Sequence, residues 1–429
     1  MFTLRARYVF PVSAPPIRGG AVSIEGERIV AVGAEPAGGP VLDLGDAAIL
    51  PGLVNAHTHL EFSRLEAPLG SPGIGFTDWL ELVIDCRRTC PPDVEALRQG
   101  ANQSAACGTT LLGDIVQSGA SYEPFLAGPV RSTVFLELIG PTRQRAEAVL
   151  QLAEDFLRGR ASRGAESHPP TQKSRFSPTT AANCRRGLSP HAPYSVRWEL
   201  LPKLAALSAE AQVPLAIHLA ESPEELEFLA TGRGPLREFL ERRGAGEPGI
   251  VPRGARPLDY LHVLARAYRV LVVHGNYLDE EEIGFAAHRR KMAVVYCPRS
   301  HSFFQHQAYR LAEMVQAGVC LALGSDSRAS TADLSMLAEM RHAAQAHPHV
   351  PPRQILQMAT INGACALGWS DLCGSLEPGK LADLVVVALS ARRAKDPHEL
   401  LVDGDLPILA VYRGGREISP TGMRRWPNG

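Results

Sequence analysis

Five side chains that could bind a metal ion each follow a short apolar run of the sequence. They are His57, His59, His218, His274 and Asp326. Imidazoles together with a carboxylate suit a borderline ion such as zinc or ferrous iron, and they leave a further coordination position for water. His57 and His59 are two residues apart, so both rings leave the same face if this segment is extended. The set therefore has the composition of one mononuclear metal site.

Each of these residues also has an ordinary structural interpretation. A single His274 at the end of an apolar run is more often a hydrogen-bonded core histidine than a ligand, and the chain contains 14 histidines. The order of the residues favours the metal site, because each group follows its own apolar run and none falls inside a predicted helix. We expect one divalent ion, with zinc as the first candidate and iron as the second.

Eight apolar runs in the middle of the chain alternate with helical patterns, and each run is expected to form a strand. The runs cover residues 53–57, 109–114, 130–138, 188–194, 215–218, 270–274, 292–297 and 319–326. Strands that alternate with helices favour a parallel sheet, and eight of them favour a closed (β/α)8 barrel. The strand ends of such a barrel converge on one rim, which would bring the metal candidates together. A doubly wound open sheet is the alternative, but no Gly-x-Gly-x-x-Gly turn follows the first run.

The two ends of the chain and one internal segment do not show this alternation of strand and helix patterns. Residues 21–32 contain two short strand patterns around a glycine turn, and residues 374–387 contain a turn followed by an apolar strand pattern. Residues 158–187 are rich in Ser, Thr, Pro, Arg and Ala, which predicts a flexible insertion without a catalytic function. The arginines of this insertion could contact nucleic acid, but Phe176 is its only aromatic residue. A solvated surface loop is therefore preferred.

Composition limits the class of partner. The chain has 429 residues, a formal net charge of -1, 45% hydrophobic residues and 21% charged residues, which is ordinary for a globular protein. No overall charge favours nucleic acid or an anionic membrane. The first residues lack the apolar core of a signal peptide, and the eight cysteines form no Cys-x-x-Cys pair. We expect a cytoplasmic protein with reduced thiols that acts on a small molecule, with a homodimer as a possible assembly.

Five short segments, taken in order, form a larger pattern. They cover residues 51–59, 218–221, 274–275, 324–326 and 379–383. As an ordered set they resemble the amidohydrolase superfamily. The most similar branch is that of the mononuclear aminohydrolases, which includes cytosine, guanine, S-adenosylhomocysteine and aminodeoxyfutalosine deaminases and the triazine chlorohydrolases. The resemblance covers nearly the whole chain except the insertion.

This resemblance has implications for the fold. It implies a distorted (β/α)8 barrel, a TIM barrel, with a small β-sandwich built from both termini. We place the sandwich at residues 1–50 and 375–429 and the barrel at residues 51–374. Binuclear branches of the superfamily carry a lysine on a middle strand. Neither 130–138 nor 188–194 contains a lysine, so one metal ion is expected.

The resemblance also assigns roles to the metal candidates. It implies that His57, His59, His218 and Asp326 are ligands and that His274 faces the reacting water. Glu221 lies just beyond His218, where it could carry a proton without binding the metal. A glutamate at this place could instead open a helix, because Ser-Pro-Glu-Glu follows it. Its position after a ligand histidine favours catalysis.

The expected reaction is hydrolytic deamination of an amino-substituted heteroaromatic ring. Glu221 would accept a proton from the attacking water and pass it to a ring nitrogen. His274 would stabilise charge on the attacking oxygen, and Asp326 would take the second proton and help to expel ammonia. Amide or halide hydrolysis at the same site, as in an amidase or a triazine-type chlorohydrolase, differs only in the leaving group and remains an alternative. A non-catalytic scaffold is the distant alternative, since no expected ligand is missing.

Substrate contacts are the least specific part of the sequence. His191 in His-Ala-Pro-Tyr could hydrogen-bond the ring, and Glu61 could bind an amine or sugar hydroxyls. Guanine deaminases typically carry Pro-Gln where this chain has Leu-Glu, which counts against guanine. Many relatives have Cys-Pro-x-Ser-Asn where this chain has Cys-Pro-Arg-Ser-His, so Arg299 and His301 are further candidates. Trp79 belongs to a candidate aromatic lid. The favoured substrate is a purine-like nucleoside such as aminodeoxyfutalosine.

Overall fold

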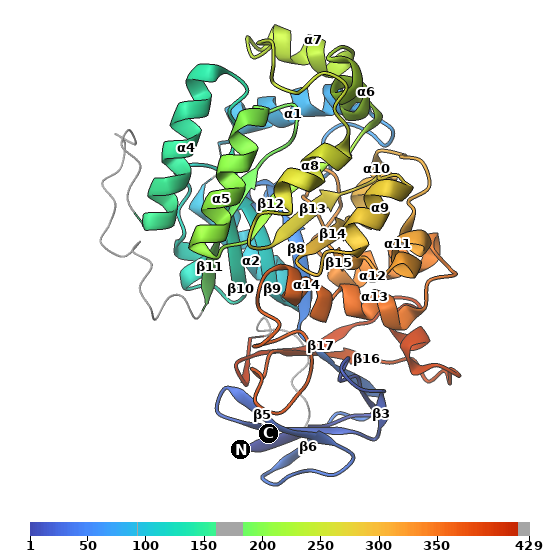
Figure 1. Cartoon of the computed structure of the whole chain (residues 1–429). Helices are drawn as coiled ribbons and strands as arrows, with labels where there is room; N and C mark the ends of the chain where they lie inside the picture. Colours follow the sequence, from blue (N-terminus) through green and yellow to red (C-terminus); the bar gives the residue numbers. More distant parts are fainter. Residues whose placement is uncertain (92, 160–182, 419–429) are drawn as a thin grey trace.

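The computed structural model describes residues 1–91, 93–159 and 183–418 (Figure 1). Its centre is a parallel sheet of eight strands in which neighbours in the sheet are consecutive in the chain, from β8 to β15. The strands are β8 (Leu53–Thr58), β9 (Thr109–Val116), β10 (Arg131–Leu138), β11 (Cys184–Pro190), β12 (Leu215–Leu219), β13 (Val270–His274), β14 (Met292–Tyr296) and β15 (Cys320–Leu323). The eight predicted strands are therefore confirmed.

The sheet closes between its first and last strands. Thr58 and Asp326 form a parallel bridge. The Asp326 N–H donates to the His57 carbonyl, and the His59 N–H donates to the Asp326 carbonyl, both at 3.1 Å. These contacts confirm the predicted TIM barrel, and they join the two segments that carry three of the metal candidates.

The fourth strand begins earlier than the sequence predicted. β11 starts at Cys184, which pairs with Ser132 of β10, although the expected strand began at residue 188. The two arginines that gave this segment a loop-like composition lie against aromatic rings, Arg185 over Trp369 and Arg186 over Phe156. Most of the predicted insertion, residues 160–182, lies outside the described residues.

Helices surround the barrel and cover its strands (Figure 1). They are α1 (Phe76–Thr89), α2 (Val94–Ala106), α3 (Glu123–Leu126), α4 (Arg143–Arg158), α5 (Leu201–Ala211), α6 (Pro223–Thr231), α7 (Pro235–Arg242), α8 (Pro257–Leu264), α9 (Glu280–Ala287), α10 (Pro298–Phe303), α11 (Leu311–Ala317), α12 (Met336–Ala346), α13 (Pro352–Met358) and α14 (Ile361–Ala366). α1, α6 and α7 lie at the end of the barrel away from the terminal sheets. Within the described residues, short 3-10 helices cover Leu60–Phe62, Trp198–Leu200 and Pro397–Leu401.

Both faces of the barrel sheet are buried, which explains why its strands read as continuous apolar runs. Alternate residues such as Ala216, Leu271 and Val273 pack in the barrel interior with residues of α14 and with Trp369. The intervening residues, such as Ile217 and Val272, pack in a second cluster with residues of the surrounding helices. The strands therefore hold their ends in fixed relative positions.

Two further sheets lie below the barrel in Figure 1, one built from the N-terminal end alone and the other from both ends of the chain. One has the order β5-β4-β1-β6, and the other the order β18-β17-β16-β7-β2-β3. Their strands are β1 (Phe2–Arg5), β2 (Tyr8–Val9), β3 (Ile17–Arg18), β4 (Ala21–Glu25), β5 (Arg28–Gly33), β6 (Val41–Asp43), β7 (Ala47–Pro51), β16 (Leu384–Ala388), β17 (Ile408–Arg413) and β18 (Arg416–Glu417). The small sheet domain is confirmed, while its exact boundaries stay a prediction.

A buried ion pair joins this small domain to the barrel. The Arg131 Nε at the start of β10 donates to the Asp383 Oδ2 at 2.8 Å, and the two side chains are 6% and 0% exposed. The other oxygen of Asp383 accepts the Gly414 N–H at 2.7 Å. Asp383 is the last residue of the 379–383 motif, so one role of this motif is to hold the small domain against the barrel.

Replacing Arg131 with methionine is expected to lower the free energy of unfolding by about 3–5 kcal/mol, because it leaves a buried carboxylate without its cation. Urea denaturation followed by circular dichroism measures the change. Arg64→Met is the matched control, since Arg64 pairs with Asp93 at 2.6 Å but both side chains are about half exposed. The control is expected to cost less than about 1 kcal/mol. Equal changes in the two variants would show that the buried pair is not structural.

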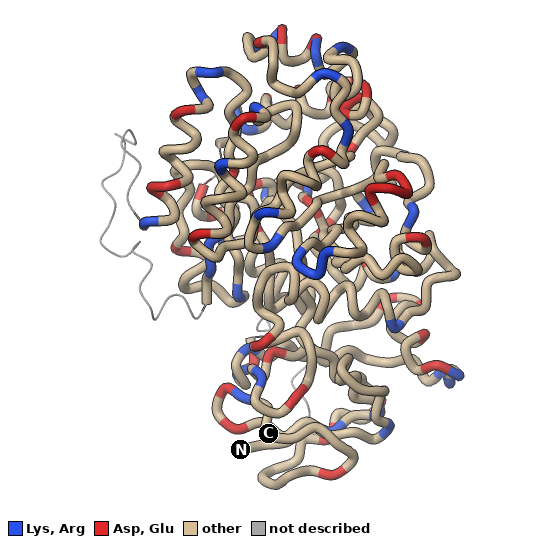
Figure 2. Tube along the Cα trace, viewed as in Figure 1, with Lys and Arg blue, Asp and Glu red and all other residues tan. Residues whose placement is uncertain are grey.

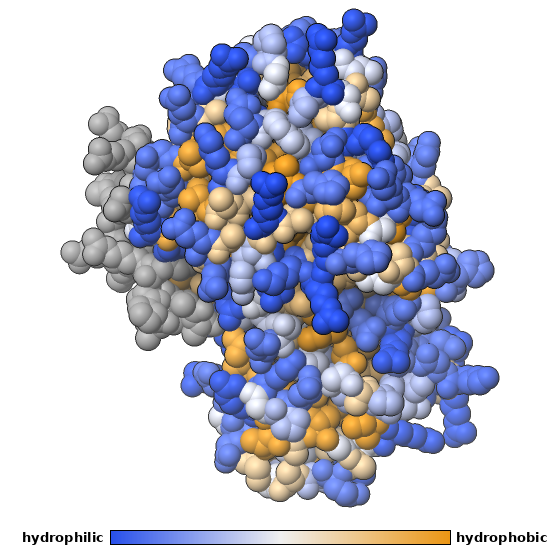
Figure 3. All heavy atoms as spheres, viewed as in Figure 1, coloured by the Kyte–Doolittle hydropathy of each residue, from blue (hydrophilic) through white to orange (hydrophobic). Residues whose placement is uncertain are grey.

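The surface agrees with a globular protein. On the face shown in Figure 3, hydrophilic residues predominate and hydrophobic residues form separate patches. In the described part of the chain, no helix is both long and apolar enough to cross a membrane.

Candidate metal centre and active site

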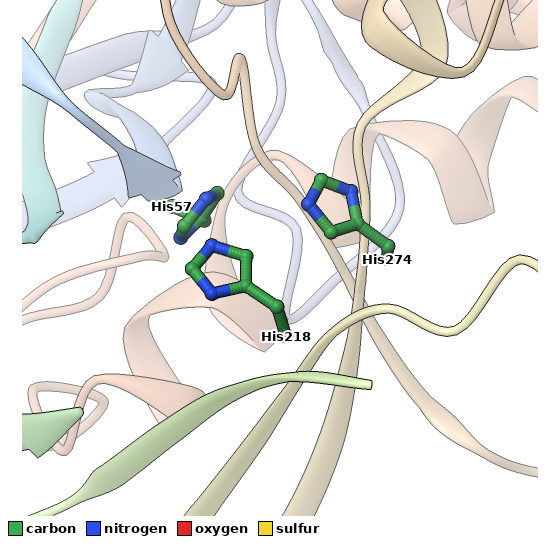
Figure 4. Close-up of side chains that lie close together, drawn as sticks. All are labelled: His57, His218 and His274. Carbon is green, nitrogen blue, oxygen red and sulfur yellow. The ribbon is translucent and has the colours of Figure 1, made fainter. Parts of the chain in front are cut away.

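The five metal candidates lie at the carboxyl ends of four barrel strands. His57 belongs to β8, His59 follows it, His218 belongs to β12, His274 ends β13, and Asp326 follows β15. All five side chains are buried. Figure 4 shows the rings of His57, His218 and His274 close together, although their strands are far apart in sequence. The convergence expected from the barrel is present.

Two overlapping groups of donor atoms have the spacing of a metal site. In each group, one formed by His57, His218 and His274 and the other by His57, His59 and Asp326, the potential ligand atoms lie within 4.8 Å of one another. The Nε2 atoms of His59 and His218 are 3.4 Å apart. Two nitrogens bound tetrahedrally to one zinc ion at 2.0–2.1 Å would be about 3.4 Å apart. The donor spacing therefore suits one ion.

The hydrogen bonding of these histidines also fits a metal ion. Both ring nitrogens of His57 and the Nδ1 of His59 are buried without a hydrogen-bond partner among the described residues. Leaving buried polar atoms unpaired costs free energy, which coordination would remove. The Nδ1 of His218 lies 2.8 Å from the His191 carbonyl. If it donates there, the Nε2 keeps its lone pair for a metal.

The imidazoles of His59, His218 and His274 are held in the neutral state that metal binding requires. Burial lowers the pKa of His59 and of His274 to about 3 in each case. Burial and the neighbouring histidines hold the pKa of His218 well below its usual range. A protonated imidazole has no lone pair for a metal, so these shifts preserve the ligand form down to acidic pH.

Asp326 has one oxygen engaged with protein and one directed toward the histidines. Its Oδ2 accepts hydrogen bonds from the hydroxyls of Ser300 and Ser330, both at 2.8 Å. Its Oδ1 lies 3.6 Å from the Nε2 of His57. Burial opposes ionisation, but the neighbouring imidazoles of His57 and His274 hold the pKa of Asp326 below its usual range. The two serines thus orient a carboxylate that sequence reasoning identified without them.

Glu221 lies beside this donor cluster but outside both donor groups. Its Oε1 is 3.3 Å from the Nε2 of His274. The Glu221 side chain is buried, and burial together with Asp326 and Glu225 raises its pKa well above the usual value. A buried carboxyl with a raised pKa is suited to general acid–base catalysis.

The loop that carries Glu221 is held by a buried carboxylate that the sequence showed only as a helix-start residue. Glu225 accepts the N–H groups of Ala220 and Glu221 at 2.9 and 3.0 Å. Ala220 has a φ of 54°, and His274 and Asp326 have φ values of 69° and 57°. Left-handed backbone at non-glycine residues is uncommon and tends to occur at functional sites. Three such residues, at the carboxyl ends of β12, β13 and β15, therefore mark this rim.

A second polar cluster adjoins the metal candidates. The guanidinium of Arg87 lies 2.6 Å from the Glu61 Oε1 and 3.3 Å from the Glu137 Oε2. Glu61 is 4.0 Å from the Nδ1 of His59, and Glu137 is 3.9 Å from the Nε2 of His191. Arg87 carries one charge for two buried carboxylates. Burial raises the pKa of Glu61 to about 7, although Arg87 opposes this effect. For Glu137, Arg87 and His191 outweigh burial and hold the pKa below its usual value.

Two members of this cluster were not predicted from the sequence. Glu137 is the second-last residue of β10, so the rule that found the metal candidates, a polar residue at the end of an apolar run, also applied to it. Its Oε1 is buried without a hydrogen-bond partner among the described residues. Arg87 lies on α1, where its position gives no local signal of the contact.

Two of the residues predicted to contact the substrate, Trp79 and His191, lie in different environments. Trp79 donates its Nε1–H to the Ala329 carbonyl at 3.2 Å. It packs in one buried cluster with Phe62, Phe76 and Phe303. His191 shares a hydrogen bond of 2.7 Å with Ser195 and lies 5.0 Å, ring to ring, from His218. His191 therefore lies beside Glu137 and the metal candidate His218, whereas Trp79 lies in the buried aromatic cluster.

Arg299 and His301 are engaged elsewhere on α10. The Arg299 Nε lies 2.6 Å from Glu339 and its Nη1 lies 2.8 Å from Asp333, which favours a role in holding α10 against α12. The ring of His301 packs near Tyr309 at 5.5 Å. The hydroxyl of Tyr309 donates to the His274 carbonyl at 2.9 Å. His301 thus lies behind His274, and its role in binding substrate stays a prediction.

Comparison with known proteins gives consistent matches. A model described as "Amidohydrolase family" matches residues 48–418. The chain is 31% identical to a 5-methylthioadenosine/S-adenosylhomocysteine deaminase of Moorella thermoacetica over 94% of this chain and 88% of that protein. It is 32% identical to an aminodeoxyfutalosine deaminase of Deinococcus radiodurans over 75% of this chain and 74% of that protein. The solved structure of Helicobacter pylori aminofutalosine deaminase with methylthio-coformycin has the same fold, with a TM-score of 0.80, 22% identity, and coverage of 97% of this chain and 100% of that chain.

Proposed function

Because the chain belongs to the amidohydrolase family, we propose that it is a metal-dependent aminohydrolase that removes the exocyclic amino group of an adenine-type nucleoside. The observation that carries the proposal is the buried Glu221, 3.3 Å from His274, beside a set of metal-type donors. Relatives that cover most of the chain are named 5-methylthioadenosine/S-adenosylhomocysteine deaminase and aminodeoxyfutalosine deaminase, which supports the reaction and the substrate class.

His57, His59, His218 and Asp326 would hold one divalent ion, with zinc as the first choice and iron as the second. When bound, such an ion lowers the pKa of water from 15.7 toward about 7 and so provides hydroxide at neutral pH. The two serine hydroxyls on the Oδ2 of Asp326 leave its Oδ1 free to face the ion.

Glu221 is the proton carrier of the proposed reaction. Its raised pKa favours the protonated carboxyl after Glu221 has taken a proton from the attacking water. The same proton then passes to a ring nitrogen next to the amine-bearing carbon, which makes that carbon more electrophilic. The Asn276 side chain donates to the Glu221 carbonyl at 2.8 Å, and Glu225 fixes its N–H, so the backbone of this residue is anchored on both sides.

His274 and Asp326 act on the oxygen that adds to the ring. The Nε2 of His274 lies on the Glu221 side of the cluster and stabilises negative charge on that oxygen. The Oδ1 of Asp326 accepts the second proton of the attacking water and delivers it to the amino group. The products are the oxo-substituted ring and ammonia, so one water molecule is consumed for each ammonia released.

The polar cluster of Glu61, Arg87 and Glu137 supports a polar substituent next to the ring, as a nucleoside has. Aminodeoxyfutalosine is the first substrate to test, and 5′-methylthioadenosine and S-adenosylhomocysteine are the second and third. Ammonia release from the zinc-loaded protein should be measured with these nucleosides, adenosine, cytosine, guanine and atrazine. Ammonia from an adenine nucleoside is the expected result. Chloride from atrazine without ammonia from any amine would instead establish a chlorohydrolase, and no turnover at full metal content would reject an enzyme of this class.

Replacing Glu137 with glutamine is expected to lower kcat/KM about 10- to 100-fold, mainly through a higher KM. The free Oε1 of Glu137 faces His191 and is placed to accept a substrate hydroxyl, and a hydrogen bond to a charged group is worth about 1.5–3 kcal/mol. Steady-state kinetics with the best nucleoside and elemental analysis measure the effect. Glu95→Gln is the control, because Glu95 forms an exposed ion pair with Arg98. A fall in metal content would show instead that Glu137 supports the metal centre.

A further inference from the structure

The barrel closes at an irregular junction between its first strand, β8, and its last strand, β15. In the described part of the chain, the backbones of these strands meet at an isolated bridge between Thr58 and Asp326, whereas the other neighbouring strands are paired within the sheet. His57 and His59 lie on the β8 side of this junction, and Asp326 lies on the β15 side. The spacing of three proposed metal ligands therefore depends on how firmly the junction is closed.

The end of the β8–β15 junction away from the metal candidates is filled by the connection between α13 and α14. The Val54 N–H of β8 donates to the Ala359 carbonyl at 2.8 Å. The Asn362 side chain donates to the Leu321 carbonyl of β15 at 2.9 Å. Residues 359–362 thus take the place of direct strand pairing at this level, and contacts between the strands must come from elsewhere.

A buried asparagine joins the two strands between this connection and the bridge. The Asn55 Nδ2 donates to the Ser325 Oγ at 2.7 Å, and the Asn55 Oδ1 accepts the Ser325 N–H at 3.0 Å. The same Oδ1 accepts a longer hydrogen bond from the His57 N–H, at 3.4 Å. Asn55 and Ser325 are both fully buried. One side chain of β8 therefore contacts the backbone of the ligand His57 and the residue directly before the ligand Asp326.

The chemistry of this contact requires an amide. Neither β8 nor β15 contains Lys, Arg, Asp or Glu, and the charged residues in Figure 2 lie mostly on the surrounding helices and loops. An ion pair between the two strands is therefore not available. The Ser325 N–H can only donate, which assigns the Asn55 oxygen to it and leaves the amide N–H to the Ser325 hydroxyl. Removal of the amide would leave a buried N–H without a partner, which is costly.

The two strands approach each other closely at the level of the ligands. A Cβ on Gly324 would lie 2.9 Å from the His57 carbonyl oxygen and 3.0 Å from the His57 Cβ, so a side chain does not fit there. The Asp326 N–H donates to the same carbonyl at 3.1 Å. The Nε2 of His57 and the Oδ1 of Asp326 are 3.6 Å apart. Any opening of the junction would consequently separate these two donor atoms.

We propose that Asn55 is a positioning residue for the metal centre. Its hydrogen bonds to Ser325 hold β8 against β15 and thereby set the distance between the ligands His57 and Asp326. The inference rests on the metal ligands of the proposed function, but not on the reaction. Residues that orient ligands without touching the ion typically change metal affinity by about 10- to 100-fold when they are replaced. We therefore expect the loss of Asn55 to weaken zinc binding.

The test measures the Kd for zinc by titrating the zinc-loaded, full-length protein with a competing chromophoric chelator. Asn55→Leu keeps the size of the side chain but removes both hydrogen bonds, and it should raise this Kd about 10- to 100-fold. Ser325→Ala removes the bond to the hydroxyl alone and should raise the Kd about 5-fold. In the double variant the Kd should equal that of Asn55→Leu, because the serine hydroxyl then has no amide to bind.

Hydrogen exchange followed by mass spectrometry gives a second readout that does not depend on zinc affinity. In the zinc-loaded Asn55→Leu variant, peptides covering residues 53–60 and 320–327 should exchange faster than in the unchanged protein, because the junction between them is less firmly closed. Unchanged exchange in both peptides would show that Asn55 does not hold the strands together.

Asn362→Leu is the matched control, because it removes the same kind of bond to β15 at the end away from the ligands. It should lower the melting temperature but change the Kd by less than about twofold. Unaltered zinc affinity in Asn55→Leu, an equal loss in Asn362→Leu, or additive effects in the double variant would overturn the proposal. Failure of the unchanged protein to bind zinc would reject the ligand assignment itself, whereas zinc binding without ammonia release would reject only the deaminase activity.

Discussion

Replacing Glu221 with glutamine is expected to lower kcat at least about 100-fold while the protein keeps its metal, because the amide cannot carry the proton and Glu221 lies outside both donor groups. Glutamine preserves the size of the side chain and a hydrogen-bond partner for the Nε2 of His274, so the fold should not change. Ammonia release under substrate saturation and elemental analysis of the same preparation measure the two quantities.

Glu227→Gln on the same helix, α6, is the matched control, since Glu227 is exposed. It should turn over like the unchanged protein. If the Glu221→Gln variant also turned over at a nearly normal rate with its metal intact, Glu221 would be only the carboxylate at the start of α6. If that variant lost its metal, Glu221 would belong to the ligand set, and the assignment of Asp326 as the fourth ligand would need revision.

Removal of the metal with 1,10-phenanthroline is expected to abolish activity, and addition of zinc should restore it. The purified protein should contain about one zinc or iron ion per chain. The melting temperature should fall on removal, because an ion that binds only the folded state stabilises it by about 4 kcal/mol at a thousandfold excess over Kd. The buried, unpaired ring nitrogens of His57 give the physical reason for this loss.

Substitution of one proposed ligand tests whether the activity depends on this metal site. His59→Asn should lower metal occupancy and activity together, whereas His349→Asn, at an exposed position after α12, should change neither. Two tightly held ions per chain would contradict the mononuclear site. Full activity in the metal-free protein would contradict the proposed chemistry itself.

The sequence alone was sufficient for the kind of fold and for most of the candidate site. Apolar runs separated by helical patterns predicted all eight barrel strands, because a strand buried on both faces must be apolar throughout. Polar residues at the ends of these runs identified His218, His274 and Asp326, since a barrel directs its strand ends to one rim. The family resemblance, read from ordered motifs, is confirmed by the match over residues 48–418.

Some features depend on contacts between distant segments and had no local signal. The bridge between Thr58 and Asp326 closes the barrel across more than half of the chain. Arg87 joins Glu61 to Glu137 only because α1 lies across the rim. The start of β11 at Cys184 was hidden by basic residues whose side chains stack on distant rings. The pattern of hydrophobic residues predicts which side chains are buried. It does not predict ion pairs or ring stacking, because these depend on partners that are distant in the sequence.

The sequence by itself therefore determined which residues form the strands and which polar groups stand at their ends. Only the tertiary structure decided how those groups face one another. It turned Arg299 toward Glu339 and Asp333, engaged one oxygen of Asp326 with two serines, and set Glu221 beside His274. The physical reason is that strand formation follows from local alternation and burial, while the direction of a side chain at a strand end depends on left-handed backbone turns and on hydrogen bonds from other strands.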